Sequence, residues 1–202
     1  MKQNKKEIKR LSFYIICLIG IALVIQLIYL QCLAPPQLGW WNYYAWRISK
    51  GDLLYKDIFC FLQPYYVWIM SFLYQFFGNK LFLYQVVGLV LRSLELTMVF
   101  FTLRRFTSDK ISFFSTLFGL IITVSYLSDF PLDCNQLIRF YTVGSAFMLI
   151  QAISIQSIKK QYIFLALSGF FCGMFLMSKQ TAIGLIFFAS LGIFLLYFKR
   201  EG

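Results

Sequence analysis

The sequence has no histidine, only 8 acidic residues, and only 13% charged residues in total. The missing histidine excludes imidazole as a catalytic base or metal ligand. The scarcity of charge excludes an ordinary soluble domain, in which about 25% of residues are charged. The cysteines are scattered without C-x-x-C spacing, which excludes the usual zinc and redox motifs. Any chemistry must therefore rest on a few carboxylates and basic groups.

Apolar residues make up 60% of the chain, and aromatic residues alone make up 20%. A water-facing fold of this length could not bury that excess, because surface grows too fast relative to volume. The sequence therefore predicts an all-α polytopic transmembrane helix bundle that forms a single domain, residues 1–202. About six spans are expected, at Leu11–Leu33, Lys80–Leu103, Ile111–Leu127, Gln136–Ile158, Tyr162–Met177 and Thr181–Phe198.

The formal net charge is +11, and the basic residues lie in short clusters between the apolar runs. This pattern is typical of topology signals and argues against a nucleic-acid partner. The first run follows "MKQNKKEIKR" and is too long for a signal peptide, with no small-x-small cleavage site after it. We expect a multi-pass protein of the cell membrane with both termini cytoplasmic and the loop after the first span outside.

The first outer loop, from Pro35 to Pro64, is rich in tryptophan and tyrosine, which settle at the lipid–water boundary. Two segments, Gly39–Lys50 and Pro64–Gly78, are predicted to be interfacial helices, because each is short, aromatic and ended by glycine. A loop that only caps the bundle is the alternative. The residues expected at the membrane interface are Trp40, Trp41, Tyr43, Tyr44, Arg47, Pro64, Tyr65 and Tyr66.

Several short motifs resemble the membrane glycosyltransferases of the GT-C fold. They are "YYAWRISKGDLLYKDIF" between the first two spans, "CNQL" before a later span, and "MSKQTA" between two spans. The superfamily includes protein O-mannosyltransferases and lipid A aminoarabinose transferases, and the motifs look like those of its bacterial RgtA/B/C/D-like subgroup. The resemblance covers essentially the whole chain. It implies a polyprenyl-phosphate-linked sugar as donor on the outer face, with no certain cofactor.

Such a transfer needs a carboxylate to activate the acceptor hydroxyl. The resemblance puts the family's main carboxylate near Gln37, which cannot ionise. Asp57 matches the aspartate of the family's "Y-R-D-x-F" and is the first catalytic candidate, ahead of Asp52 in the same loop and Asp133 in the second outer loop. The alternatives are a linker aspartate paired with a nearby lysine for Asp57, and a helix cap for Asp133.

The leaving lipid phosphate needs cationic groups. Lys179 matches the lysine of the family's "T-K" turn, and Arg139 lies just inside an outer helix end, so both are candidates for binding that phosphate. Snorkelling to the interface is the alternative for Lys179. Two isolated outer-loop aspartates do not make a metal site, and none is expected.

Arg92 and Glu95 lie in the middle of a predicted span, where an unpaired charge is costly. Their i, i+3 spacing places them on one helix face, which predicts a mutually paired bridge facing the bundle, with a proton or ion path as the alternative. Gly169 and Gly173 have G-x-x-x-G spacing, which predicts close helix packing within the chain rather than a dimer face.

The chain ends directly after the sixth predicted span, whereas whole members of the resembled family carry more spans. It therefore looks like the N-terminal half of a larger GT-C type module, and a membrane partner would supply the rest. Two functions compete. One is sugar transfer from a polyprenyl-phosphate carrier in envelope or capsule glycan assembly, and the other is a non-enzymatic membrane subunit or lipid-linked glycan transporter.

Overall fold

The computed structural model describes residues 2–32, 37–60, 64–123, 132 and 134–178. Within these residues the chain is helical and contains no named strand, so the predicted all-α membrane bundle is confirmed. The described helices are α1 (Lys2–Cys32), α2 (Gln37–Ser49), α3 (Pro64–Phe77), α4 (Leu81–Leu103), α5 (Asp109–Thr123), α6 (Cys134–Ser154) and α7 (Ile158–Ser178).

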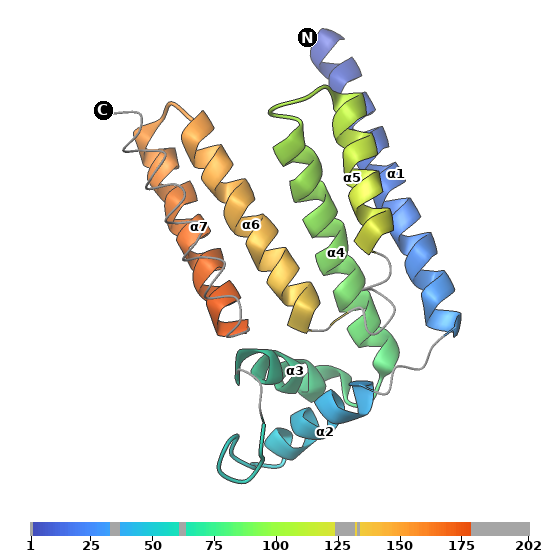
Figure 1. Cartoon of the computed structure of the whole chain (residues 1–202), viewed down its shortest axis with the longest axis vertical. Helices are drawn as coiled ribbons and strands as arrows, with labels where there is room; N and C mark the ends of the chain where they lie inside the picture. Colours follow the sequence, from blue (N-terminus) through green and yellow to red (C-terminus); the bar gives the residue numbers. More distant parts are fainter. Residues whose placement is uncertain (1, 33–36, 61–63, 124–131, 133, 179–202) are drawn as a thin grey trace.

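The long helices run alongside one another, and α2 and α3 lie across one end of them (Figure 1). Helix α4 is central, with contacts to α1, α5 and α6, while α6 and α7 form a closely packed pair. Helix α2 packs on α3, and α3 touches α4 and α7. We call α2, α3 and the connection between them the transverse layer. Its position is the one expected for helices that lie at a membrane interface.

Four described segments are long and apolar enough to cross a membrane, in agreement with four of the six predicted spans. They are Glu7–Ile25, Phe82–Leu103, Cys134–Ser154 and Ile158–Ser178. Helix α5 is described for 15 residues, fewer than the roughly 20 that a span needs. Its predicted continuation to Leu127 and the sixth predicted span, Thr181–Phe198, fall outside the described residues.

The predicted boundary between the last two described spans was wrong by four residues on each side. Helix α6 ends at Ser154 rather than Ile158, and α7 begins at Ile158 rather than Tyr162. The first backbone hydrogen bond of α7 runs from the Gln161 N–H to the Ser157 carbonyl at 2.9 Å, so Ser157 directly precedes the helix. Serine is a favoured residue directly before a helix, and this signal outweighs the hydropathy of Ile158.

Glycine ends both helices of the transverse layer, as predicted. Gly51 follows α2 with φ +100° and Gly78 follows α3 with φ +54°, a region that glycine adopts without a steric penalty. The Gly78 N–H donates to the Tyr74 carbonyl at 2.8 Å. The predicted and observed limits of these two helices agree to within two residues.

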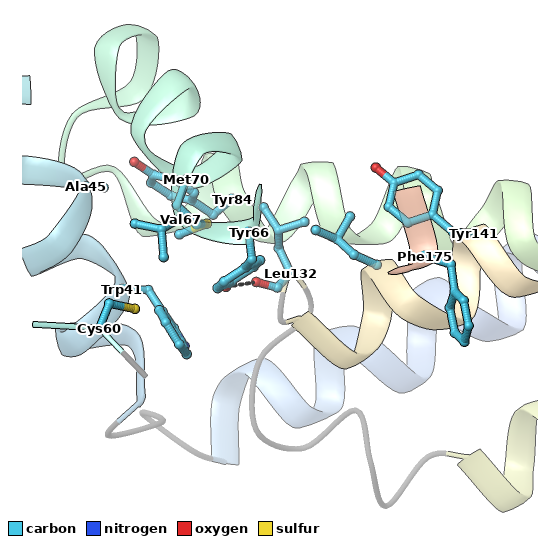
Figure 2. Packing of buried hydrophobic residues seen from close by; sticks show 11 residues of the cluster. Trp41, Ala45, Cys60, Tyr66, Val67, Met70, Tyr84, Leu132, Tyr141 and Phe175 are labelled. Atoms are coloured by element: carbon cyan, nitrogen blue, oxygen red, sulfur yellow. Dashed lines mark hydrogen bonds between the residues drawn. The ribbon is translucent and has the colours of Figure 1, made fainter. Parts of the chain in front are cut away.

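A buried cluster joins the transverse layer to the long helices (Figure 2). The ring of Trp41 in α2 meets the ring of Tyr66 in α3 edge to face, with 4.8 Å between centroids. The Tyr66 hydroxyl donates to the Leu132 carbonyl at 2.8 Å (Figure 2). The cluster continues to Tyr141 in α6 and Phe175 in α7. The transverse layer is therefore packed onto the bundle through a shared core.

Ion pairs fasten the opposite end of the bundle. Arg104 at the end of α4 contacts Glu7 of α1 at 2.6 Å and Asp109 of α5 at 2.8 Å, and Arg10 contacts Asp109 at 2.5 Å. The hydrogen bond from Arg104 holds the pKa of Asp109 below its usual range. The N-terminus, the α4–α5 connection and the α6–α7 connection all lie at this end (Figure 1), and its cytoplasmic location stays a prediction.

Helices α6 and α7 are in close contact at Gly144. A Cβ atom placed there would lie 2.8 Å from the Phe171 ring, so a larger residue would have to displace that ring. Among the described residues, nothing lies within 4 Å of a Cβ placed at Gly169 or Gly173. Neither glycine of the G-x-x-x-G pair therefore packs against another described helix, so the predicted packing through this pair stays a prediction, whereas Gly144 lies in the contact between α6 and α7.

Candidate functional site

The first catalytic candidate, Asp57, closes a tight turn within the transverse layer. Its carboxylate Oδ2 accepts the Leu53 N–H at 2.9 Å, and its own N–H donates to the Leu53 carbonyl at 2.9 Å. The turn holds Tyr55 at φ +69°. A bulky residue rarely adopts this conformation, and such strained positions cluster at functional sites. The "Y-x-D" motif thus has a defined backbone shape with an exposed carboxylate.

Arg47 brings the two loop aspartates to one point. Its Nε donates to the Asp52 carboxylate in an ion pair, its Nη1 donates to the Tyr43 hydroxyl at 2.8 Å, and its Nη2 donates to the Asp57 carbonyl at 3.4 Å. The bond to Asp52 raises the pKa of Arg47, so the guanidinium remains charged. Asp52 is engaged by this cation, whereas the Asp57 carboxylate is bonded to a main-chain amide.

Two tyrosines, Tyr44 in α2 and Tyr55 in the turn, supply neutral hydroxyl groups. Burial raises the pKa of Tyr44 and of Tyr55, and the nearby Cys60 thiol adds to the effect. Both side chains therefore stay protonated at neutral pH and can donate hydrogen bonds. The end of α2 and the turn that follows it thus carry a carboxylate acceptor, a fixed cation and phenolic donors, which suit recognition of a sugar or a phosphate.

The predicted interface residues differ in how far their side chains are exposed. Tyr43 is exposed, Tyr44, Arg47, Pro64 and Tyr65 are half-buried, and Trp41 and Tyr66 are buried. Trp41 and Tyr66 face each other within the molecule and stabilise the layer rather than presenting their faces to solvent (Figure 2). The side chain of Trp40 lies outside the described residues.

Arg139 belongs to a buried polar chain that runs between α4, α5 and α6. Its Nη2 donates to Gln136 at 2.7 Å, Gln136 Nε2 donates to Glu95 Oε2 at 2.9 Å, and Arg92 Nη1 donates to Glu95 Oε1 at 2.6 Å. Arg92 also donates to the Thr123 hydroxyl. The predicted bridge between Arg92 and Glu95 is confirmed, and Gln136 is a partner that the i, i+3 pattern did not reveal.

Three of the predicted site positions fall where no side chain is described. Asp133 and Lys179 lie outside the described residues, and the side chain of Gln37, the first residue of α2, is likewise not described. In the sequence, Asp133 directly precedes α6 and Lys179 directly follows α7. Both helices have these ends at the transverse layer (Figure 1). Within the described part of the chain, no group of three or more cysteine or acidic side chains could hold a metal ion.

The chain matches the family model described as dolichyl-phosphate-mannose-protein mannosyltransferase over residues 63–201. This segment contains 139 of the 202 residues and includes α3 and all later helices. Asp52 and Asp57 precede it, while Arg139 and Lys179 lie inside it. Comparison with curated proteins and with solved structures returned no match.

Proposed function

Since this chain belongs to the dolichyl-phosphate-mannose-protein mannosyltransferase family, whose members are membrane glycosyltransferases of the GT-C type, we propose that it transfers a sugar from a polyprenyl-phosphate carrier. The transfer takes place at the outer face of the cell membrane, at the transverse layer. The observation that carries the proposal is the placement of Asp57 in an exposed, strained turn on that layer, at the end of the bundle where α6 begins and α7 ends.

The reaction needs one base and one site for a leaving phosphate. The acceptor hydroxyl oxygen bonds to the anomeric carbon, the bond from that carbon to the phosphate oxygen breaks, and the polyprenyl phosphate leaves with the electron pair. In our proposal the Asp57 carboxylate takes the hydroxyl proton. Asp52 holds Arg47 in place, so that the guanidinium orients the turn.

Arg139 and Lys179 are the proposed partners of the lipid phosphate. Arg139 lies in the second turn of α6, beside the transverse layer, and Lys179 follows Ser178 at the end of α7. A guanidinium can hold a phosphate through two parallel hydrogen bonds, whereas an ammonium acts as a point charge. Envelope or capsule glycan assembly is the process that we propose for the product.

Asp57 has two roles in this proposal, as acceptor of the Leu53 N–H and as the base, and asparagine preserves only the first. The amide side chain introduced by Asp57→Asn can still accept the Leu53 N–H through its carbonyl oxygen, so the turn is retained while the base is lost. The variant Asp57→Ala loses both. The assay uses membranes that contain the full chain, supplied with polyprenyl-phosphate-linked mannose labelled in the sugar, and measures release of polyprenyl phosphate together with labelled product.

We expect Asp57→Asn to reduce transfer by at least about 100-fold, the usual contribution of a general base, at an unchanged protein level. Lys56→Gln, the neighbouring exposed position, is the control and should leave transfer intact. Retained transfer in Asp57→Asn but not in Asp57→Ala would assign Asp57 a purely structural role. No transfer by the wild-type chain with any polyprenyl-phosphate sugar would favour a non-enzymatic membrane subunit instead.

A further inference from the structure

A cleft of about 870 Å³ opens at the end of the bundle opposite the transverse layer. It lies between the last turn of α4 and the α6–α7 pair, whose ends diverge from α4 there (Figure 1). The polar residues in its wall are Arg104, Arg105, Asp109 and Gln151. The proposed transfer reaction uses none of them, so this cleft needs a separate explanation.

The two arginines of the cleft are in different electrostatic situations. Arg104 is held between Glu7 and Asp109, and Asp109 also contacts Arg10, so these four side chains balance their charges. Arg105 instead donates through Nη2 to the neutral Gln151 side chain at 2.6 Å. An arginine has five N–H donors, so the exposed Arg105 can bind an anion without breaking an ion pair.

The remaining wall of the cleft is apolar and lies deeper along the helices. Phe147 precedes the end of α6 by seven residues and Phe164 follows the start of α7 by six, which places both roughly 10 Å from the helix ends at 1.5 Å per residue. Phe101 lines the α4 side of the same space. The cleft thus combines a cationic mouth at the helix ends with aromatic side walls within the bundle.

We propose that this cleft binds an anionic phospholipid of the surrounding leaflet. The headgroup phosphate is held by Arg105, and an acyl chain runs inward over Phe147 and Phe164. The cationic mouth matches the anionic headgroup of a phospholipid, and the aromatic walls match its acyl chains. Basic clefts between transmembrane helices are suited to such headgroups. The proposal does not depend on the transfer reaction, since the two sites lie at opposite ends of the bundle.

The charge around the mouth favours an anionic lipid over a zwitterionic one. Lys110 at the start of α5 and Lys159 and Lys160 at the start of α7 add exposed positive charge to the same end of the bundle. Each basic residue near a membrane surface attracts anionic lipid by about 1 kcal/mol. Lys159 does not line the cleft, so a variant at this position distinguishes a localised binding site from a general electrostatic attraction.

The test uses the purified full chain in phosphatidylcholine nanodiscs with increasing fractions of phosphatidylglycerol, and native mass spectrometry measures the retained phosphatidylglycerol. The wild-type chain should retain phosphatidylglycerol in preference to phosphatidylcholine. Arg105→Gln should weaken retention about fivefold, the equivalent of one lost basic contact, whereas Lys159→Gln should change it less than twofold. If Arg105→Gln does not fold, a photoactivatable phosphatidylglycerol on the wild-type chain should label the segments 101–105 and 147–151.

Four outcomes would overturn the proposal. Equal losses in Arg105→Gln and Lys159→Gln would indicate a diffuse basic surface, and an unchanged Arg105→Gln would remove the residue from the site. Displacement of the lipid by millimolar inorganic phosphate would indicate a free-phosphate site. Preferential binding of polyprenyl phosphate over phosphatidylglycerol would assign the cleft to a carrier lipid.

Discussion

The hydroxyl groups of Tyr65 and Tyr141 lie 2.6 Å apart and form a hydrogen bond between α3 and α6. Tyr65 belongs to the transverse layer and Tyr141 to a spanning helix, so the bond fixes the layer relative to the bundle. The adjacent Tyr66 makes a second bond of this kind, to the Leu132 carbonyl at 2.8 Å. Two consecutive residues of α3 thus attach the loop that carries Asp57 to the start of α6.

Removing the Tyr65 hydroxyl should loosen this attachment. Tyr65→Phe leaves the buried Tyr141 hydroxyl without its partner, which costs about 1–3 kcal/mol. We expect a lower midpoint of thermal unfolding in detergent and faster proteolysis between α2 and α3. Tyr162→Phe, at an exposed position in α7, is the matched control and should have no effect.

The double variant Tyr65→Phe/Tyr141→Phe distinguishes a direct bond from two independent contributions. If the bond is present, the double variant should be destabilised by less than the sum of the two single variants, because the second change leaves no unpaired hydroxyl. Strictly additive effects would contradict the bond.

Replacing one residue of the buried pair Arg92 and Glu95 should reduce stability more than replacing both. Their side chains are only 4% and 7% exposed, so Glu95→Gln leaves a buried cation with a weaker partner, and breaking such pairs costs about 3–5 kcal/mol. The double variant Arg92→Met/Glu95→Leu should be destabilised less than a variant in which only one member of the pair is replaced, such as Glu95→Gln. The comparison is made by thermal unfolding of the purified variants. A double variant less stable than both single variants would instead show that the wider polar chain to Gln136 is essential.

Gly144 and Gly169 should respond in opposite ways to the same substitution. Gly144→Ala places a Cβ 2.8 Å from the Phe171 ring, and overpacking of this kind costs about 1–3 kcal/mol. Gly169→Ala meets nothing within 4 Å among the described residues and should be neutral or slightly stabilising, because alanine favours helix over glycine by about 1 kcal/mol. Thermal unfolding checks both variants. Equal destabilisation by the two would contradict the packing of α6 on α7.

These glycines show where sequence reasoning succeeds and where it stops. Hydropathy located four spans, because a helix must satisfy its own backbone in lipid. Spacing also identified the pair of Arg92 and Glu95, which is local to one helix. The choice of Gly144 over Gly169 depends on which faces of α6 and α7 meet, a tertiary property that G-x-x-x-G spacing within one helix does not determine.

The candidate site was predictable to a similar extent. The "Y-x-D-x-F" motif pointed to Asp57, but its bond to the Leu53 N–H arises from the turn that holds Tyr55 at positive φ. Gln136 joins Glu95 across 41 positions of sequence, and no periodic pattern connects residues so far apart. The local chemistry could therefore be read from the motif, whereas the partners required the fold.

Asp109 should make the end of the bundle opposite the transverse layer sensitive to acid. The hydrogen bond from Arg104 lowers its pKa in the folded state, so the stabilisation is complete above the unfolded value of about 3.9 and is lost as pH falls through the folded value. Asp109→Asn should lower the free energy of unfolding by about 1 kcal/mol at neutral pH and flatten its loss below about pH 4. Unfolding midpoints measured across this range check it. If the stability of Asp109→Asn falls with acid as steeply as that of the wild-type chain, other carboxylates cause the acid sensitivity.

The orientation of the bundle can be tested with two cysteine variants at its opposite ends. Lys50→Cys is exposed at the end of α2 and Lys159→Cys is exposed at the start of α7, and each is introduced into a chain whose native cysteines are replaced by serine. The excess of basic residues at the Lys159 end predicts that this end is cytoplasmic. A membrane-impermeant maleimide should therefore label Lys50→Cys in intact cells and label Lys159→Cys only after the membrane is opened. The reverse pattern would place the transverse layer inside the cell, where it could not act on a carrier lipid at the outer face.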